Sequence, residues 1–483
     1  MNFRMILKSL GSVLCIEAFC MFPALLVSMI YGQGDKGAFI LAMILVLLVG
    51  VLLYQIKPTN SDIYARDGFA IVALGWILIS FFGALPFVFS GVIPSLSDAL
   101  FESISGFTTT GATILTEIES LPKGILFWRS FTHWMGGMGV LVLTLAVLPS
   151  VKANTVHIMK AESPGPTPEK LVPKIGQTVK ILYAIYIVIT ALEFLCLMLG
   201  GLSVYDALIH AFGTAGTGGF SNKNASVAAF GNLKIEVIIT VFMFLFGVNF
   251  TLYFQSIRGN FKSILKNEEL RFYVGVVLTS ILLITINIHG SVYQSIGEAL
   301  RYSSFQVNSI ITTTGFGTAD FNVWPTFSKC ILVFLMVIGA SAGSTGGGVK
   351  CIRILLLIKI ARREVAKIIH PRSVHTVKIG GKAVDEETLS GIMAFFFLYM
   401  FIFVSAVLFI ALDGKDIITS VTAVIATISN IGPGLEMVGP TGNFAAFSVL
   451  GKGILSFCMI IGRLEIYPVL ILLSPAFWKR VNI

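Results

Sequence analysis

Long apolar segments alternate with short polar connections along almost the whole chain. An α-helix needs about 20 apolar residues to cross the hydrocarbon core of a bilayer, and these segments reach that length. No connection is long enough for a soluble domain. The pattern predicts an all-α, multi-pass membrane protein with about ten transmembrane helices, at residues 9–30, 37–56, 68–91, 125–149, 177–200, 234–257, 272–289, 327–358, 388–412 and 447–474.

Four short polar runs, each centred on glycine, follow apolar helical segments. Their glycines align at Gly111, Gly218, Gly315 and Gly432, roughly 100 residues apart, which leaves room for two spans and a re-entrant loop each. We predict four tandem units of outer helix, half-length pore helix, filter and inner helix around one pore, after an N-terminal helix pair. The predicted limits are 1–60 for the pair, then 61–175, 176–265, 266–385 and 386–483 for the four repeats.

Composition and charge agree with a place in a lipid bilayer. The 483 residues are 55% hydrophobic and 12% charged, which is more apolar surface than a soluble core hides. The net charge of +9 does not indicate nucleic-acid binding, because Lys and Arg lie at span ends and in the connections. With a cytoplasmic N-terminus, most of these residues fall on the cytoplasmic side, as the positive-inside bias requires.

The four polar runs have the composition of an ion filter. Backbone carbonyls can replace the hydration shell of potassium, and glycine allows the dihedral angles that turn successive carbonyls toward one axis. One such run alone more often marks a turn or close helix packing, but four matched copies favour a filter. An acidic residue also opens each predicted pore helix, where it can cap free N–H groups: Asp98, Asp206, Glu298 and Asp416.

The segment at 327–358 is too long for one span and contains a run of small residues: Ser341, Ala342, Gly343, Ser344, Thr345, Gly346, Gly347 and Gly348. This run should break the helix, and irregular backbone at membrane depth needs protein or water around it. We interpret it as a movable gate bordering the pore, with close helix packing as the alternative. Arg463 lies inside the last apolar segment, where a charge is costly. We expect it to act as an electrostatic barrier facing the pore; an ion pair with Glu193 or Glu465 is the alternative.

The four runs, together with residues 340–348 and the Gly-Arg-Leu-Glu sequence at 462–465, resemble the Trk/Ktr/HKT superfamily of cation transporters. The resemblance covers nearly the whole chain and is strong to bacterial Trk-type membrane subunits. It implies K⁺ as the transported and bound ion, with no organic cofactor in this chain. It also implies a homodimer with one pore per protomer, a cytosolic nucleotide-binding regulatory ring, and a place in the bacterial cytoplasmic membrane.

With this resemblance, we assign cation coordination to the backbone carbonyls of Thr109, Thr110, Gly216, Thr217, Thr313, Thr314, Asn430 and Ile431. The four aligned glycines supply the geometry. The residues after them, Ala112, Gly219, Phe316 and Pro433, stand where a potassium channel has tyrosine, which predicts a looser filter. Plant members of the superfamily with serine at the first glycine are associated with sodium transport, so Gly111 favours potassium.

Other functions stay open at this point: a sodium/potassium or proton-coupled transporter of the same fold, an ion-coupled carrier, and a membrane-embedded enzyme. A carrier should show inverted repeats around a midplane site, whereas these repeats run in one direction. An enzyme needs positioned catalytic groups, and the six histidines are scattered without HExxH spacing. We therefore predict potassium uptake through a four-repeat filter, gated by the intramembrane loop and a cytosolic partner, and no enzymatic activity.

Overall fold

The computed structural model describes residues 1–58, 64–139, 175–373 and 375–478. Helices dominate these residues, with one short hairpin of β1 (Lys378–Ile379) and β2 (Lys382–Ala383). Six helical segments within them are long and apolar enough to cross a membrane: Phe3–Tyr31, Lys36–Tyr54, Arg66–Phe89, Gln177–Leu199, Glu268–Ile288 and Glu386–Ala411. They match six of the predicted spans, so the all-α class with several spanning helices is confirmed.

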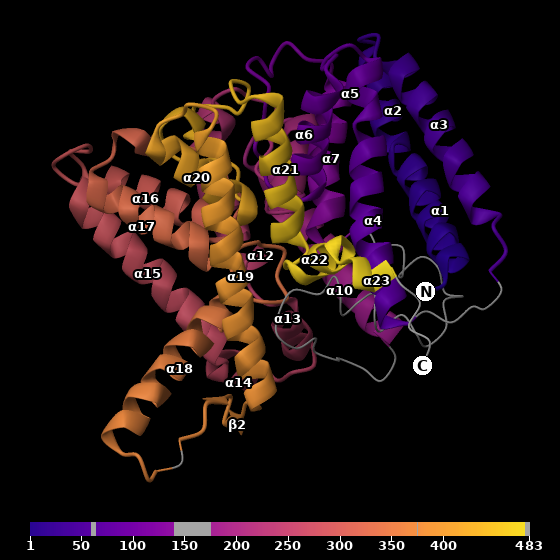
Figure 1. The fold of residues 1–483 in the computed structure, drawn as a ribbon. Coiled ribbons are helices and arrows are strands. Elements are labelled where there is room, and N and C mark those ends of the chain that lie inside the picture. Colours follow the sequence, from indigo (N-terminus) through magenta and orange to yellow (C-terminus); the bar gives the residue numbers. More distant parts are fainter. Residues whose placement is uncertain (59–63, 140–174, 374, 479–483) are drawn as a thin grey trace.

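The N-terminal helices lie beside the first repeat (Figure 1). Gly11 and Gly50 allow the first and third helices to approach closely, since a Cβ at either would meet the backbone or Cys15 of the facing helix. The elements of this part are α1 (Phe3–Cys20), α2 (Phe22–Tyr31), α3 (Lys36–Tyr54), α4 (Ala65–Gly83), α5 (Leu85–Phe89), α6 (Leu96–Phe107) and α7 (Lys123–Gly137).

Each later repeat has the same order of a long outer helix, a pore helix and an inner helix. The second contains α10 (Ile175–Leu199), α11 (Val204–Ala215), η2 (Ser226–Phe230), α12 (Leu233–Phe246), α13 (Phe250–Ile257) and α14 (Phe261–Lys266). The third contains α15 (Glu268–Ile288), α16 (Ile296–Ile311), η3 (Phe321–Val323), α17 (Thr326–Ile338) and α18 (Cys351–Ile369). The fourth contains α19 (Glu386–Ala411), α20 (Ile417–Ile428), η4 (Glu436–Val438), α21 (Val449–Arg463), α22 (Tyr467–Leu473) and α23 (Pro475–Trp478).

The inner helices are interrupted: the break in the third was predicted, whereas those in the second and fourth correct the predicted continuous spans at 234–257 and 447–474. Helices α12 and α13 meet at 90°. A loop at 339–350 separates α17 from α18, and residues 464–466 separate α21 from α22. Helix α7 ends at Gly137, and the predicted continuation of that span lies outside the described residues. The predicted repeat limit at 60 also falls outside them, and the limits at 60, 175, 265 and 385 all stay a prediction.

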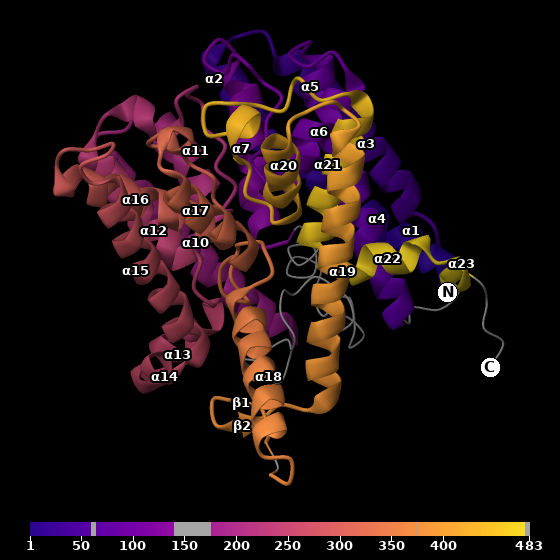
Figure 2. The same ribbon diagram turned by 60° about the vertical axis from the view of Figure 1, so that its left-hand side comes forward.

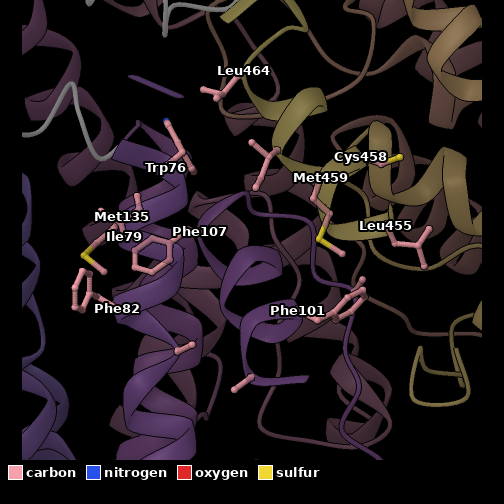
Figure 3. Packing of buried hydrophobic residues seen from close by; sticks show 14 of the residues in the cluster. Trp76, Ile79, Phe82, Phe101, Phe107, Met135, Leu455, Cys458, Met459 and Leu464 are labelled. Carbon is pink, nitrogen blue, oxygen red and sulfur yellow. The ribbon is translucent and has the colours of Figure 1, made fainter. Parts of the chain in front are cut away.

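The first and fourth repeats share one hydrophobic core. Figure 3 shows Trp76 of α4, Phe107 of α6, Met135 of α7 and Met459 of α21 within the same buried cluster. Helix α21 packs directly on pore helix α6 although the two are far apart in sequence. The first and fourth repeats thereby lie side by side although they are far apart in sequence.

The first three pore helices begin one turn earlier than their acidic residues predict. The residue at the N-cap of the first three is serine, at Ser95, Ser203 and Ser295, and the acid follows in the first turn. There the negative charge still favours the positive helix end. Only in the fourth does the acid itself cap the helix, because Asp416 accepts a hydrogen bond from the N–H of Thr419 at 2.8 Å.

Helix α18 and the adjoining end of α19 extend away from the other helices, with the hairpin between them (Figure 2). The N-terminus and α23 lie toward this same end, whereas the connections before and after the pore helices lie toward the opposite end (Figure 1). The described chain therefore has one end formed by pore-helix connections and another that carries α18 and the hairpin.

Candidate ion filter and gate

All four pore helices end in the same hydrogen-bonded turn. After α6, Thr109 N–H bonds to Gly106 O at 3.1 Å and Thr110 N–H bonds to Ser105 O at 2.9 Å. This pair of bonds defines a Schellman motif, which requires a left-handed residue after the helix. Equivalent bonds follow the other pore helices, and the left-handed residues are Thr109 (φ 56°), Thr217 (φ 53°), Thr313 (φ 60°) and Asn430 (φ 55°).

The motif fixes the register of the four segments and corrects one predicted alignment. The glycine two residues after each left-handed residue also has a positive φ: Gly111 (78°), Gly219 (75°), Gly315 (80°) and Gly432 (96°). The second segment therefore contributes Gly219, not Gly218, and its carbonyls equivalent to Thr109 and Thr110 belong to Thr217 and Gly218, not Gly216 and Thr217. The sequence offers two adjacent glycines, and the bond from Thr217 N–H to Thr214 O selects the second.

The four segments form a closed ring. Each of these glycines faces the carbonyl of a neighbouring segment so closely that an added Cβ would lie less than 3.0 Å from it: Gly111 at Gly218 O, Gly219 at Thr314 O, Gly315 at Ile431 O, and Gly432 at Thr110 O. The contacts run from the first segment to the second, third and fourth and back to the first. Only glycine fits such an approach in this backbone conformation.

A cavity of about 160 Å³ opens on the glycine side of the ring. All four ring glycines line it, together with the connections that follow the filter segments, including Lys223, Asn224 and Thr441. The cavity therefore lies at the end of the molecule that carries the pore-helix connections and leads directly to the ring.

The predicted gate run at 341–348 lies against the other side of the ring. The N–H of Gly347 donates to Thr313 Oγ1 at 2.7 Å. An added Cβ at Gly346 or Gly347 would lie less than 3.0 Å from the carbonyl of Thr312 or Ser429, respectively. The loop is therefore directly beneath the third and fourth filter segments.

Hydrogen bonds tie this loop to the neighbouring repeats. Three join it to the break between α12 and α13: Ser341 N–H to Gly247 O at 3.1 Å, Phe250 N–H to Gly343 O at 3.0 Å, and Thr345 Oγ1 to Phe246 O at 3.3 Å. A fourth runs from Ala342 N–H to Glu269 Oε1 of α15 at 2.7 Å. Within the loop, Ser344 Oγ donates to Ser341 O at 2.6 Å, and Gly348 packs on Gly339. The loop is thus irregular, and its backbone polar groups bond to backbone and side-chain groups of the neighbouring repeats.

Arg463 joins the loop to the first inner helix. Its Nη1 donates to Thr345 O at 2.9 Å, and its Nη2 donates to Gly137 O at 2.7 Å and to Gly136 O. The two glycine carbonyls end α7 and are part of its negative helix end, which attracts a guanidinium. Of the two predicted ion-pair partners, Glu465 pairs with Arg353, and Glu193 is buried in α10.

Sequence reasoning missed a group of buried polar residues behind the first two filter segments. Glu102 Oε1 of α6 accepts a hydrogen bond from Arg129 Nε of α7 at 2.6 Å, and both side chains are buried. His133 lies one turn further along α7, with Nδ1 2.7 Å from Gly106 O and its ring against Gly218. The available signal was a glutamate and an arginine within apolar helices, where ionisable residues indicate a site.

The sequence is similar to proteins that are named for cation or potassium transport. The family model for TrkH, described as a cation transport protein, matches residues 35–480. The Trk system potassium uptake protein TrkH of Salmonella typhimurium is 38% identical over 486 residues, covering 99% of this chain and 100% of that protein. The Trk system potassium uptake protein TrkG of Escherichia coli strain K12 is 33% identical over 481 residues and covers 99% of each chain.

A solved structure agrees with the sequence relatives. The crystal structure of the potassium transporter TrkH from Vibrio parahaemolyticus superposes with a TM-score of 0.89 at 36% sequence identity. The match covers 99% of this chain and 100% of that one.

Proposed function

We propose that this chain takes up potassium ions through its four-segment ring, since it belongs to the TrkH family of cation transport proteins. The observation that carries the proposal is the closed ring, in which each glycine faces a carbonyl of the neighbouring segment. Such a ring brings backbone carbonyls of all four repeats around one axis, where they can replace the hydration shell of a cation. The chain is accordingly a transporter rather than an enzyme, with K⁺ as its cargo.

The coordinating carbonyls are proposed in the corrected register. They belong to the two residues before each ring glycine: Thr109 and Thr110, Thr217 and Gly218, Thr313 and Thr314, and Asn430 and Ile431. The pore helices end at these residues, so their partly negative ends point toward the ring and favour a cation there. Gly216 then supports the second segment as its cap residue.

The loop at 341–348 is proposed to gate the path beneath the filter. It lies against the cap residues Thr312 and Ser429, and Arg463 adds a positive charge that holds it to α7 and α21. Helix α18 begins directly after the loop, with Lys350 as its N-cap residue. Movement of α18 would therefore displace the loop, which gives a two-state element for control.

The assembly and its location are proposed from the family. The chain is placed in the bacterial cytoplasmic membrane as a homodimer, with its N-terminus in the cytoplasm and a cytosolic nucleotide-binding ring as regulatory partner. The projecting end of α18 supports this, because it carries Lys359, Arg362, Arg363 and Lys367 on the same side as the N-terminus (Figure 1).

The function is tested by rubidium and potassium flux into liposomes that contain the purified full-length chain. Gly315→Ala is expected to abolish most flux, because its Cβ would strike Ile431 O in the ring. Gly290→Ala is the matched control, since Gly290 has nearly the same backbone conformation (φ 77° against 80°) but nothing within 4 Å. Absence of potassium and rubidium flux in the unmodified chain, with and without its partner, would overturn the proposal.

A further inference from the structure

The corrected register places an aromatic residue directly after the ring glycine in two of the four segments. Phe220 follows Gly219 and Phe316 follows Gly315, whereas Ala112 and Pro433 follow the glycines of the first and fourth segments. Both phenylalanines are buried, at 1% exposure each. The ring is therefore flanked by bulky side chains on one half only.

Each of the two phenylalanines stacks on a buried histidine. The Phe220 and His133 ring centroids are 4.0 Å apart with planes 30° from parallel. The Phe316 and His210 centroids are 5.6 Å apart with planes 27° from parallel. Stacked aromatic pairs of this kind add stabilisation beyond the apolar area they bury.

Hydrogen bonds hold both histidines in place. His133 Nδ1 donates to Gly106 O of the first pore helix at 2.7 Å. His210 Nδ1 lies 2.8 Å from Asp206 O within α11, and its Nε2 lies 3.0 Å from Ser221 Oγ, next to Phe220 in sequence. A carbonyl can only accept, so each Nδ1 carries a proton. Neither ring can shift without losing a buried hydrogen bond.

A second group, the ion pair of Arg129 and Glu102, also contacts Phe220 and its neighbours. The guanidinium carbon of Arg129 lies 3.4 Å from the Phe220 ring centroid, which is a cation–π contact. Arg129 Nη1 also donates to Ser221 O at 3.1 Å. Glu102, the partner of Arg129, accepts hydrogen bonds from Thr113 Oγ1 at 2.9 Å and Ile114 N–H at 3.0 Å. The ion pair thus links the chain that leaves the first filter segment to the chain that leaves the second.

The fourth inner helix does not repeat this arrangement. Gly136 of α7 and Gly462 of α21 occupy equivalent places, because an added Cβ at either would meet the carbonyl of the last residue of its own pore helix. Counting back from these glycines, α21 has Met459 and Leu455 where α7 has His133 and Arg129. The histidine and arginine contacts are therefore found at one half of the ring and do not recur in every repeat.

We propose that Phe220 and Phe316, each fixed by its histidine, are positioning residues that keep the second and third filter segments from moving inward. A smaller cation such as sodium requires the carbonyls to close around it, and packed rings resist such a movement. The two phenylalanine–histidine pairs then contribute to discrimination of potassium over sodium. The inference rests on the proposed function of the ring.

The test is the ratio of potassium to sodium flux in liposomes containing the full-length chain. Phe220→Leu and Phe316→Leu are each expected to lower this ratio by about threefold or more, the scale of losing a stacked aromatic contact, and the double variant to lower it further. Phe230→Leu is the matched control, since Phe230 contacts the same His210 edge-on, with 5.0 Å between centroids, but lies in η2 outside the filter segments. Its ratio should stay at that of the unmodified chain.

Assembly is checked for every variant by gel filtration and thermal unfolding. If Phe220→Leu does not assemble, the flux ratio of His133→Gln tests the second segment instead. This change removes the imidazole that stacks on Phe220 and keeps a donor for Gly106 O. Unchanged ratios in the assembled single and double variants would overturn the inference while leaving the proposed function intact. A chain without potassium flux would overturn the proposed function itself.

Discussion

Threonine or asparagine occupies the left-handed position after every pore helix, although glycine would adopt that conformation more easily. An ordinary L residue there costs roughly 1–2 kcal/mol. The side chains of Thr313 and Asn430 make hydrogen bonds that glycine could not make. Thr313 Oγ1 accepts the bond from Gly347 of the loop, and Asn430 Nδ2 donates to Thr110 Oγ1 at 2.9 Å. These two side chains connect the ring to the loop and the fourth segment to the first.

Gly111→Ser should weaken selection for potassium. The residue has a φ of 78°, and its new side chain would meet Gly218 O, so this quarter of the ring must move. We expect the potassium-to-sodium flux ratio to fall by about tenfold, which corresponds to ~1.4 kcal/mol. Gly290→Ser is the control, with a φ of 77° and open space around it. An equal ratio in the two variants would mean that Gly111 does not shape the filter.

Arg463→Ala should raise flux in the absence of any partner. The change removes a positive charge beneath the filter and the bonds to Thr345 O and Gly137 O, so the loop loses its link to α7. A severalfold increase in basal rubidium flux is expected. Arg463→Lys keeps the charge but only part of the bonding. Its basal rubidium flux should therefore lie between that of the unmodified chain and that of the alanine variant. Loss of assembly in the alanine variant, with lysine restoring it, would instead favour a structural role.

Among the elements, the pore helices depend on their caps for local stability. Asp416→Ala removes the acceptor for Thr419 N–H in α20 and should lower the free energy of unfolding by about 1 kcal/mol. Asp416→Asn retains an acceptor, so its free energy of unfolding should fall much less. Thermal unfolding of the purified variants in one detergent measures both. Equal melting temperatures for alanine and asparagine would show that the cap bond contributes nothing.

The loop between α17 and α18 should control flux without setting ion preference. Shortening the run at 341–348 removes backbone from beneath Thr312 and Ser429 and leaves the ring glycines in place. Basal flux should then rise severalfold, with the order of potassium, rubidium and sodium unchanged. The response to a regulatory partner should weaken at the same time, because α18 has no obstruction left to move. Equal basal flux and an equal response in assembled protein would contradict a gating role.

The sequence predicted the helices well where long apolar segments alternate with polar connections. It predicted the filter register less well where one of two adjacent glycines had to be chosen. Apolar length identified six segments able to span a membrane, and the repeated glycines identified the four segments of the ring. Of the adjacent Gly218 and Gly219 the prediction chose Gly218 and was wrong by one residue, because only the hydrogen bonding shows which glycine turns. From the sequence, Gly247 fits either a bend or a close helix contact, because the residues on both sides are apolar and helical, and the structure shows the bend.

On the scale of the whole molecule, the two ends of the helices should face opposite sides of the membrane. We expect Lys382→Cys in the hairpin to react with an impermeant thiol reagent only from the cytoplasmic side. Thr441→Cys at the cavity should react only from outside. Both are exposed, and the six native cysteines must first be replaced because Cys330 is also exposed. Labelling of both from one side would contradict the proposed orientation.

The bond between Asn430 and Thr110 spans 320 residues, and this separation bears on how the protein is made. Ribosomes add roughly 5–20 residues per second, so the first filter segment waits roughly 16–64 s for the fourth. During that time Glu102 can already hold Thr113 and Ile114, which lie just beyond the first segment. A nascent chain that has entered the membrane but not yet reached Asn430 contains three filter segments and an open side. The closed ring is thus among the last features to be completed during synthesis, and a chain that terminates before Asn430 lacks it.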